Sequence, residues 1–376
     1  MSRPVYRTIL RTFIGFICAI LPLSVEAQVR VYFGTYTNGE SKGIYVADIA
    51  AGNGEMTNLR LAAEAKNPSF LAIHPTQRVL YAVGELSESE GGGPSVTAYA
   101  IDPATGLLKA LNSLSTGGNG PCHVALDPTA RWAAVANYGS GSVAVYSLQP
   151  SGALLAQVGF RQHQGSGPNP ERQEGPHAHC VRFSSHGRLF VTDLGLDQII
   201  TYGLLENGAL IDGPTARLAP GAGPRHMTFS PDGRHLLVNN ELASTVTSFA
   251  HDPVTSHLHA IDTETTLPHD FTGSNTTAEI IISPQGDTVY CSNRGHDSIA
   301  VLKFDPQTGQ LMRTGHIPTQ GQTPRNFNLT RDGRLLVVAN QSTNDVRPFF
   351  ISPTGGVTAG MKALQVPSPV CVVFAY

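Results

Sequence analysis

The sequence predicts an all-β fold, a seven-bladed β-propeller, and three observations carry this prediction. A strand-turn-strand unit recurs seven times along the chain, and successive units begin 53, 57, 46, 53, 47 and 45 residues apart. These steps are close to the roughly 40 to 50 residues of a propeller blade. The 39 Gly and 26 Pro interrupt short runs rich in Val, Ile, Tyr and Phe, and no long helical period follows the first 27 residues. The units begin at Pro68, Pro121, Ala178, Pro224, Thr277, Pro324 and Pro369.

The N-terminus has the features of a signal peptide. Three arginines within the first 11 residues precede an apolar run over residues 13–23, and residues 25–27 resemble a small-residue cleavage site. The apolar run is well short of the roughly 20 residues that span a bilayer. We therefore expect a signal peptide over residues 1–27, a propeller domain over residues 28–376, no stable membrane anchor after leader removal, and a periplasmic or secreted protein.

The two ends of the mature chain are expected to share one blade. Residues 29–36 and 43–49 read as strands with no inner strand before them, whereas the last unit supplies a single strand, residues 370–376. Pairing these segments completes one sheet and protects its edges from association with other chains. The closing blade is thus predicted to combine N-terminal and C-terminal strands.

Each of the other units reads as an antiparallel hairpin. Residues 121–137, 224–240 and 324–340 are the clearest copies, each with an apolar strand, a turn and a second apolar strand that ends in polar residues. Because an antiparallel hairpin begins and ends at the same end, the first and last residues of all units are expected on one face, around a central mouth.

The residue types at this mouth are unusual for structural strands. The positions directly after the opening residue hold Ser69, Cys122, His179, Arg225, Ala278 and Arg325, and the next positions hold Phe70, His123, Cys180, His226, Glu279 and Asn326. The hairpins end in Glu85, Asn137-Tyr138, Asp193, Asn240-Glu241, Asn293-Arg294 and Asn340-Gln341. The recurring Asn is expected to adopt the left-handed conformation and to cap a turn. The residue after it varies, as a binding site requires.

Charge and cysteine content exclude some functions. The formal net charge is −3 with both signs mixed along the chain, which argues against a nucleic-acid partner. Four cysteines remain after the leader. Cys122 and Cys180 are one register position apart in neighbouring units, so strand alternation points them to opposite faces. We expect small buried residues rather than disulfides.

Several separated motifs resemble one known family, the seven-bladed propeller lactonases, which include propeller-type 6-phosphogluconolactonase and fungal carboxymuconate-lactonising enzymes. The resemblance covers nearly all of the mature chain. The motifs are Gly34-Thr35-Tyr36-Thr37, Gly120-Pro121-Cys122-His123, GSGPNPERQEGPHAH over residues 165–179, Gly223-Pro224-Arg225-His226, NRGHDS over residues 293–298 and Pro324-Arg325-Asn326-Phe327.

The resemblance implies an active site of one His, two Arg and one Glu, with no metal or organic cofactor. These residues map onto His179, Arg225, Arg294 and Glu241, with His177 as the alternative histidine. Lactone hydrolysis needs a base that activates water and a donor for the developing oxyanion. His179 or Glu241 can be the base, and the two arginines suit the oxyanion or another anionic group of the substrate. A structural ion-pair ring is the alternative.

Further candidates surround this set. Substrate contacts are expected from His123, His177, His226, Glu85, Asn326 and Arg325. Hydrogen-bonded core histidines are the alternative for His123 and His226. His177 and His179 stand one residue apart without a further set of ligands, a weak metal signal, so no metal is expected. The stretch 165–175, rich in Gly and Pro, either covers the mouth or forms a plain surface loop.

The predicted function is hydrolysis of a sugar lactone, 6-phosphogluconolactone or a related aldonolactone, with the small-molecule lactone as the partner. The resemblance implies the phosphorylated lactone, whereas an exported protein suits an unphosphorylated one. Two alternatives stay open: a non-catalytic binding propeller and a muconate-type lactonising cycloisomerase.

Overall fold

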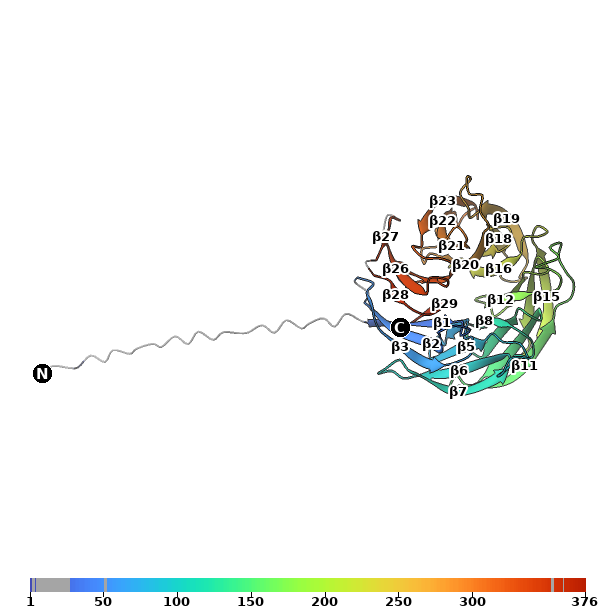
Figure 1. The fold of residues 1–376 in the computed structure, drawn as a ribbon. Helices are drawn as coiled ribbons and strands as arrows, with labels where there is room; N and C mark the ends of the chain where they lie inside the picture. Colours follow the sequence, from blue (N-terminus) through green and yellow to red (C-terminus); the bar gives the residue numbers. More distant parts are fainter. Residues whose placement is uncertain (2–3, 5–27, 51–52, 353–354, 361) are drawn as a thin grey trace.

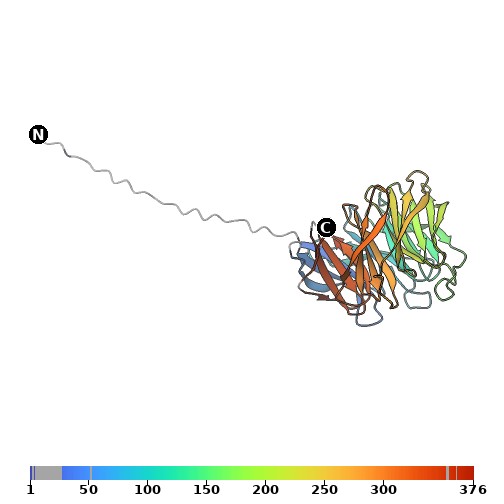
Figure 2. The ribbon, with the colours of Figure 1, turned by 90° about the horizontal axis from the view of Figure 1, so that it is seen from above.

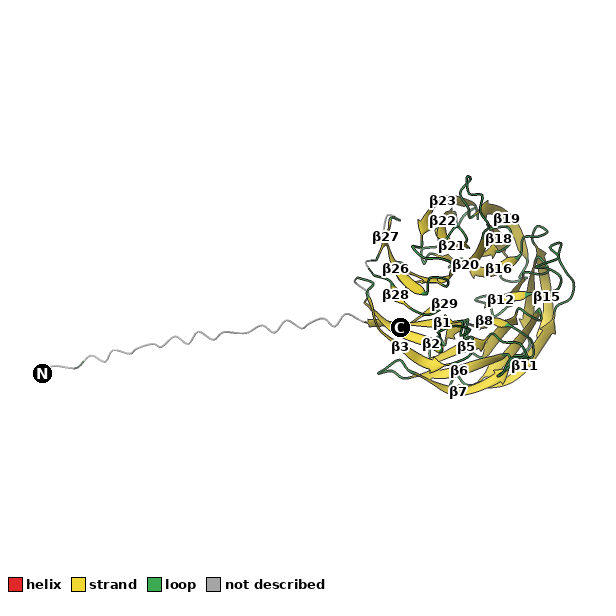
Figure 3. Ribbon diagram, in the orientation of Figure 1, coloured by secondary structure: helices red, strands yellow, loops and turns green. Residues whose placement is uncertain are grey.

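A computed structural model describes Met1, Pro4 and residues 28–376 except 51–52, 353–354 and 361. The predicted signal peptide therefore lies outside the described residues apart from Met1 and Pro4. The described chain contains 29 strands and no helix (Figure 3). Nothing in this part of the chain is a helix able to cross a membrane.

Seven sheets are arranged in a ring around a common centre (Figure 1). Each has at least four antiparallel strands, and the view turned by 90° shows the ring from the side (Figure 2). The predicted seven-bladed propeller is confirmed. The first three blades after the closing blade are β4 (Leu71–Ile73), β5 (Val79–Gly84), β6 (Ser95–Ile101) and β7 (Leu108–Ser115); β8 (Pro121–Leu126), β9 (Trp132–Asn137), β10 (Ser142–Leu148) and β11 (Leu154–Gln162); and β12 (Ala178–Phe183), β13 (Leu189–Asp193), β14 (Gln198–Leu204) and β15 (Leu210–Arg217).

The other three blades continue the same order, with a broken outer strand in the last. They are β16 (Pro224–Phe229), β17 (His235–Asn240), β18 (Thr245–His251) and β19 (Leu258–Thr265); β20 (Thr276–Ile282), β21 (Thr288–Arg294), β22 (Ser298–Phe304) and β23 (Leu311–Pro318); and β24 (Pro324–Leu329), β25 (Leu335–Asn340), β26 (Asp345–Ile351), β27 (Val357–Ala359) and β28 (Leu364–Gln365).

The closing blade has the strand order β29-β1-β2-β3, from β29 (Pro369–Ala375), β1 (Gln28–Thr35), β2 (Gly43–Ala50) and β3 (Met56–Glu64). The predicted sharing of this blade between the two ends of the chain is confirmed. The first strands of the seven blades contact one another in turn, and β29 closes this inner ring by touching β24 and β4. The predicted strand-turn-strand units left out the third and fourth strands of the other blades, and in the closing blade β3 was missed because its exposed polar residues hide the strand pattern.

The hydrophobic core lies between neighbouring blades rather than in one central mass. Strand β9 is buried on both of its faces because a blade packs on either side. Its residues Ala133 and Val135 face one neighbour, and Ala134 and Ala136 face the other. The inner strands therefore read as nearly continuous apolar runs, and polar side chains are left for their ends.

The recurring asparagines at the ends of the second strands hold the blades together. The predicted left-handed conformation is wrong for Asn137, Asn240, Asn293 and Asn340, because the left-handed residue comes four positions later, as at Asp297 with φ of 53°. The expected capping does occur, since Asn137 Nδ2 donates to Ser142 Oγ across its own turn over 3.0 Å, and the side chains also reach the previous blade. Asn293 Nδ2 donates to the carbonyl of Thr266, 2.9 Å away, at the end of the previous blade's outer strand, and Asn137 and Asn340 make the equivalent bonds.

Candidate active site

The first strand of five blades carries a β-bulge at its mouth end. A bulge leaves a residue without a cross-strand partner and redirects its side chain, and bulges are frequent beside active sites. Here the bulges bring consecutive side chains to the centre of the ring. The bulged residues are Cys122, His179, Arg325 and the pairs Arg225-His226 and Ala278-Glu279.

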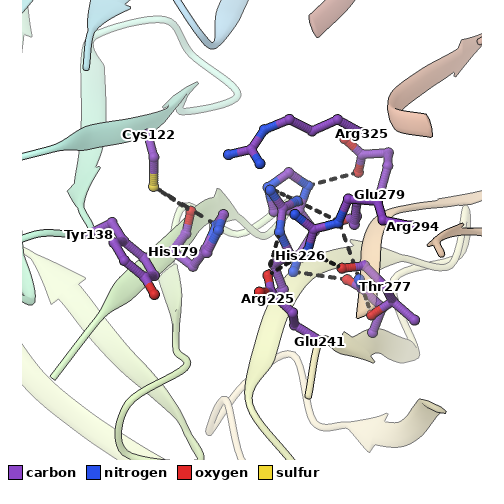
Figure 4. A network of polar contacts seen from close by, with 12 residues as sticks. Cys122, Tyr138, His179, Arg225, His226, Glu241, Thr277, Glu279, Arg294 and Arg325 are labelled. Atoms are coloured by element: carbon purple, nitrogen blue, oxygen red, sulfur yellow. Dashed lines mark hydrogen bonds and ion pairs between the residues drawn. The ribbon is translucent and has the colours of Figure 1, made fainter. Parts of the chain in front are cut away.

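These residues and the ends of the second strands enclose a cavity of about 290 Å³ at the mouth. It is lined by His179, Arg225, Glu241 and Arg294, the four predicted catalytic residues, which come from β12, β16, the turn after β17 and β21 (Figure 4). Larger hollows of about 600 and 410 Å³ contain none of these four. The mouth cavity is lined by Glu85, Cys122, Tyr138, Arg172, His179, Arg225, Glu241, Thr276, Arg294 and Arg325.

Glu241 is the centre of the cluster. Its Oε2 lies 2.9 Å from Arg225 Nε and 3.0 Å from Arg294 Nη2. Its Oε1 accepts a hydrogen bond of 2.7 Å from Arg172 Nη2. The Arg225 contact is an ion pair without hydrogen-bond alignment. The carboxylate is 5 % exposed, so three arginines share one buried negative charge.

The electrostatics of the cluster favour Glu241 as an anchor rather than a base. Burial opposes its ionisation, but Arg294 and Arg225 hold its pKa well below the usual range. Burial lowers the pKa of Arg294 to about 9, with Glu241 opposing and Arg225 reinforcing the shift. The carboxylate is therefore ionised at neutral pH and is a very weak base.

His179 has the opposite character. Burial and the charge of Arg225 lower its pKa well below 6.5, so its imidazole is neutral at pH 7. Its Nδ1 lies 3.8 Å from Cys122 Sγ, and its ring is 5.3 Å from the ring of Tyr138, edge to face. A neutral imidazole can accept a proton from water, which makes His179 the better base of the two predicted alternatives.

Arg325 belongs to a second group of hydrogen-bonded residues at the cavity. Arg325 Nη2 donates to Tyr36 Oη over 2.7 Å, and Tyr36 Oη donates to Glu85 Oε2 over 3.0 Å. Burial raises the pKa of Glu85, while Arg325 opposes this shift. The predicted candidates Glu85 and Arg325 therefore both line the cavity, joined through a tyrosine.

His226, Glu279 and Asn326 form a hydrogen-bonded layer beneath the cavity. His226 Nε2 lies 3.2 Å from Arg225 Nη1, and His226 Nδ1 lies 3.0 Å from Glu279 Oε1. Asn326 donates to Glu279 Oε2 and accepts from the backbone N–H of Val372 in β29. Burial raises the pKa of Glu279 to about 7. This chain links Arg225 to the closing strand.

His123 and His177 lie outside the mouth cavity. His123 belongs to the lower layer, where it stacks on Phe70 with ring centroids 4.0 Å apart. His177 stacks on Tyr138 at 4.4 Å and has its Nε2 3.2 Å from Glu174 Oε1. Of the two histidines in the PHAH segment, the structure brings His179 to the other candidates.

Some lining residues were not among the predicted site residues. Tyr138 and Cys122 occupy the identified register positions, but their residue types did not suggest chemistry. Arg172 comes from the loop 163–177 between β11 and β12, whose path no strand pattern predicts. Part of this loop does reach the mouth, through Arg172.

The described residues contain no group of three or more His, Cys, Asp or Glu side chains that could hold a metal ion. All four described cysteines are free and buried, which agrees with the prediction of small buried residues. The polar atoms of the cavity are mainly guanidinium donors, which suit an oxygen-rich anion.

Fold and site together define a β-propeller with a small, arginine-rich pocket at its central mouth. A family model described as "Lactonase, 7-bladed beta-propeller" matches residues 30–374. The chain belongs to this family, as its motifs predicted, and the prediction of a lactonase-class enzyme, a carboxylic-ester hydrolase, is confirmed at the level of the family.

Three relatives illustrate the similarity. A Bacillus subtilis 6-phosphogluconolactonase is 36% identical over 347 residues, which cover 92% of this chain and 98% of that protein. A 6-phosphogluconolactonase from Formosa agariphila is 32% identical over 327 residues, 85% of this chain and 91% of that protein. The solved structure of a Pseudomonas aeruginosa periplasmic gluconolactonase has a TM-score of 0.88 and 32% identity, covering 93% of this chain and 99% of that chain.

Proposed function

We propose that this protein hydrolyses a sugar lactone, 6-phosphogluconolactone or a related aldonolactone, in the cavity at the propeller mouth. The observation that carries the proposal is the neutral imidazole of His179 beside arginines whose orientation is fixed by the ionised Glu241. This arrangement offers a base and an oxyanion site in one cavity. The named lactonases among the relatives support the same reaction.

The proposed reaction begins when His179 takes a proton from a water molecule whose oxygen attacks the lactone carbonyl carbon. The carbonyl oxygen becomes an oxyanion, which Arg225 and Arg294 stabilise. When this intermediate collapses, the bond between the carbonyl carbon and the ring oxygen breaks, and His179 returns the proton to the ring oxygen. The product is a hydroxy acid, which ionises and releases one proton to solvent.

Glu241 acts in this proposal by orienting the arginines. Arg225 also donates from Nη1 to the carbonyl of Ala278 over 2.6 Å, and Arg294 donates from Nη2 to the carbonyl of Thr277 over 2.8 Å. Because a carboxylate and a carbonyl hold each guanidinium, it needs little reorganisation when the oxyanion forms. Such preorganisation is the main source of electrostatic catalysis.

We also propose that the protein acts outside the cytoplasm. The leader predicted over residues 1–27 supports export, and a periplasmic gluconolactonase is among the similar structures. An exported enzyme would meet aldonolactones formed outside the inner membrane. Fractionation of cells that produce the full chain tests this location, since accumulation in the cytoplasm at full length contradicts it.

The test of the activity is proton release in a pH-stat with gluconolactone and with 6-phosphogluconolactone, compared with spontaneous opening. The matched variants are Arg225→Ala and Arg234→Ala, because Arg234 is a 59% exposed arginine in a hairpin turn. We expect the wild-type protein to release protons faster than spontaneous opening does. Arg225→Ala should lose this additional rate, and Arg234→Ala should keep it. Absence of any excess from folded protein on both lactones contradicts the proposal. Turnover of an unsaturated dicarboxylate instead would indicate the cycloisomerase.

A further inference from the structure

We propose that Arg172 forms a subsite for an anionic group on the substrate, a phosphate ester or a carboxylate, at the exocyclic C6 position of the sugar lactone. The inference rests on the proposed function and deepens it by naming the substrate class, lactones of anionic sugars. Arg172 was not among the predicted site residues.

The loop that carries Arg172 is held in place by a buried amide. Gln173 is completely buried, and its Nε2 donates to the carbonyl of Leu194 and to Asp197 Oδ1, each over 2.8 Å. Its Oε1 accepts from the backbone N–H of Asn169 over 3.1 Å. These bonds fix the backbone next to Arg172, so its side chain is presented to the cavity from a defined position.

The guanidinium of Arg172 retains donors that a ligand can use. Its side-chain hydrogen bonds within the described chain are both made by Nη2, to Glu241 Oε1 and, over 3.3 Å, to Tyr138 Oη. Arg225 and Arg294 differ, because each also donates to a main-chain carbonyl. The Arg172 side chain is 37% exposed, against 3% for Arg225 and 14% for Arg294.

The charges of the cavity favour an anionic ligand. Four guanidinium groups line it, those of Arg172, Arg225, Arg294 and Arg325. Glu241 is ionised, whereas burial raises the pKa of Glu85. Positive charge is therefore in excess, and a guanidinium binds phosphate or carboxylate oxygens in pairs.

The direction of the substrate follows from burial. The reacting carbonyl must lie at the buried groups, Arg225 and His179, which are 3% and 5% exposed. In the δ-lactone of a six-carbon sugar, C6 is the exocyclic carbon on C5, and C5 is joined to the carbonyl carbon through the ring oxygen. With the carbonyl at the buried groups, the C6 substituent can extend out of the ring toward the more exposed Arg172, which shares the Glu241 carboxylate with Arg225. An anion at C6 forms an ion pair there, whereas a neutral hydroxymethyl group forms only a hydrogen bond.

The test compares Arg172→Gln with the control Arg234→Gln. The control removes the same charge from Arg234, which lies in an exposed turn and pairs with Asp232. Steady-state kinetics use three lactones: 6-phosphogluconolactone, a lactone of glucaric acid that carries a C6 carboxylate, and neutral gluconolactone. We expect Arg172→Gln to raise KM about 10- to 100-fold for the anionic lactone that the enzyme uses. For gluconolactone KM should change about threefold or less, as for a neutral exposed hydrogen bond.

The outcomes separate this subsite from a general structural role. Preference for the phosphate or the carboxylate lactone identifies the anion. Equal loss of activity on all three lactones shows that Arg172 acts through Glu241 and overturns the subsite, as does an unchanged KM for all three. Thermal unfolding of the variant checks that it is folded.

Failure of the proposed function gives a different result. If the wild-type protein hydrolyses no lactone, calorimetric titration with 6-phosphogluconate, glucarate and gluconate still tests the subsite. Tighter binding of one of the two C6 anions than of gluconate, lost in Arg172→Gln, supports it. Equal binding of the three sugar acids, or no binding, overturns it.

Discussion

Two buried histidines make the stability of this propeller steeply dependent on acid pH. Burial lowers the pKa of both His123 and His179 well below 6.5. In the unfolded chain each takes a proton as the pH falls through about 6.5, whereas in the folded protein each stays neutral. The unfolded state then binds more protons, so stability is fully present above pH 6.5 and is lost as the pH falls.

The magnitude follows from the proton count. A difference of one proton changes the free energy of unfolding by about 1.4 kcal/mol per pH unit, so two histidines give about 2.7 kcal/mol between pH 6 and 5. His226 and Glu279 together add nothing to this difference in bound protons. In the folded protein their buried pair holds one proton below pH 7, and in the unfolded chain the histidine holds one. The raised pKa of Glu85 offsets part of the loss. His74, His235 and His316, whose pKa values burial also lowers, add to the loss, so we expect a net slope of at least about 1.4 kcal/mol per pH unit.

Urea unfolding followed by the fluorescence of Trp132, the single tryptophan, measures this slope at pH 8, 7, 6 and 5. The variant His179→Gln should lower the slope by about 1.4 kcal/mol per pH unit. His257→Gln is the control, because His257 is exposed, and should leave the slope unchanged. A free energy of unfolding that is constant between pH 6 and 5 would refute the assignment of neutral buried histidines.

Three further predictions concern the site and the closing strand. Glu279→Gln replaces one of two acceptor oxygens by an amide donor, so either the amide of Asn326 or the backbone N–H of Ile280 loses its acceptor. Stability should fall by about 1 to 3 kcal/mol and KM should rise because Arg225 is misplaced. Urea unfolding and kinetics measure both, and unchanged values would contradict the hydrogen-bonded chain. Glu241→Gln leaves three arginines around a neutral group. We expect kcat to fall at least about 100-fold and the free energy of unfolding to fall by about 3 to 5 kcal/mol. A variant with the wild-type kcat would contradict the anchoring role of Glu241. Removal of residues 369–376 deletes the strand that closes the ring and should abolish soluble folded protein in circular dichroism, whereas a folded truncated chain would contradict the closure.

The fold was predictable because the inner strands carry the repeating sequence pattern. Strands such as β9 are buried on both faces, so their apolar runs recur at the blade period. The outer strands face solvent, and their exposed polar residues left β3 unrecognised. Turn chemistry explained only part of the role of Asn137 and Asn293, whose side chains bond a neighbouring blade as well as their own turn.

The site was predictable where side chains stand at repeat positions. The register placed His179, Arg225 and Arg294 at the mouth, and the structure brings them together around Glu241. The bulges are not visible in the register, which assumes strict alternation along each strand. Arg172 could not be placed either, because the path of its loop depends on tertiary bonds made by a neighbouring glutamine.

The comparison of wild-type protein with His179→Gln on gluconolactone and 6-phosphogluconolactone at pH 7.5 tests the central claim most directly. Loss of the proposed base should lower kcat by about 100- to 10,000-fold on the preferred lactone, while KM stays near the wild-type value because the arginines remain. A folded His179→Gln protein with the wild-type kcat would show that the reaction does not use this histidine.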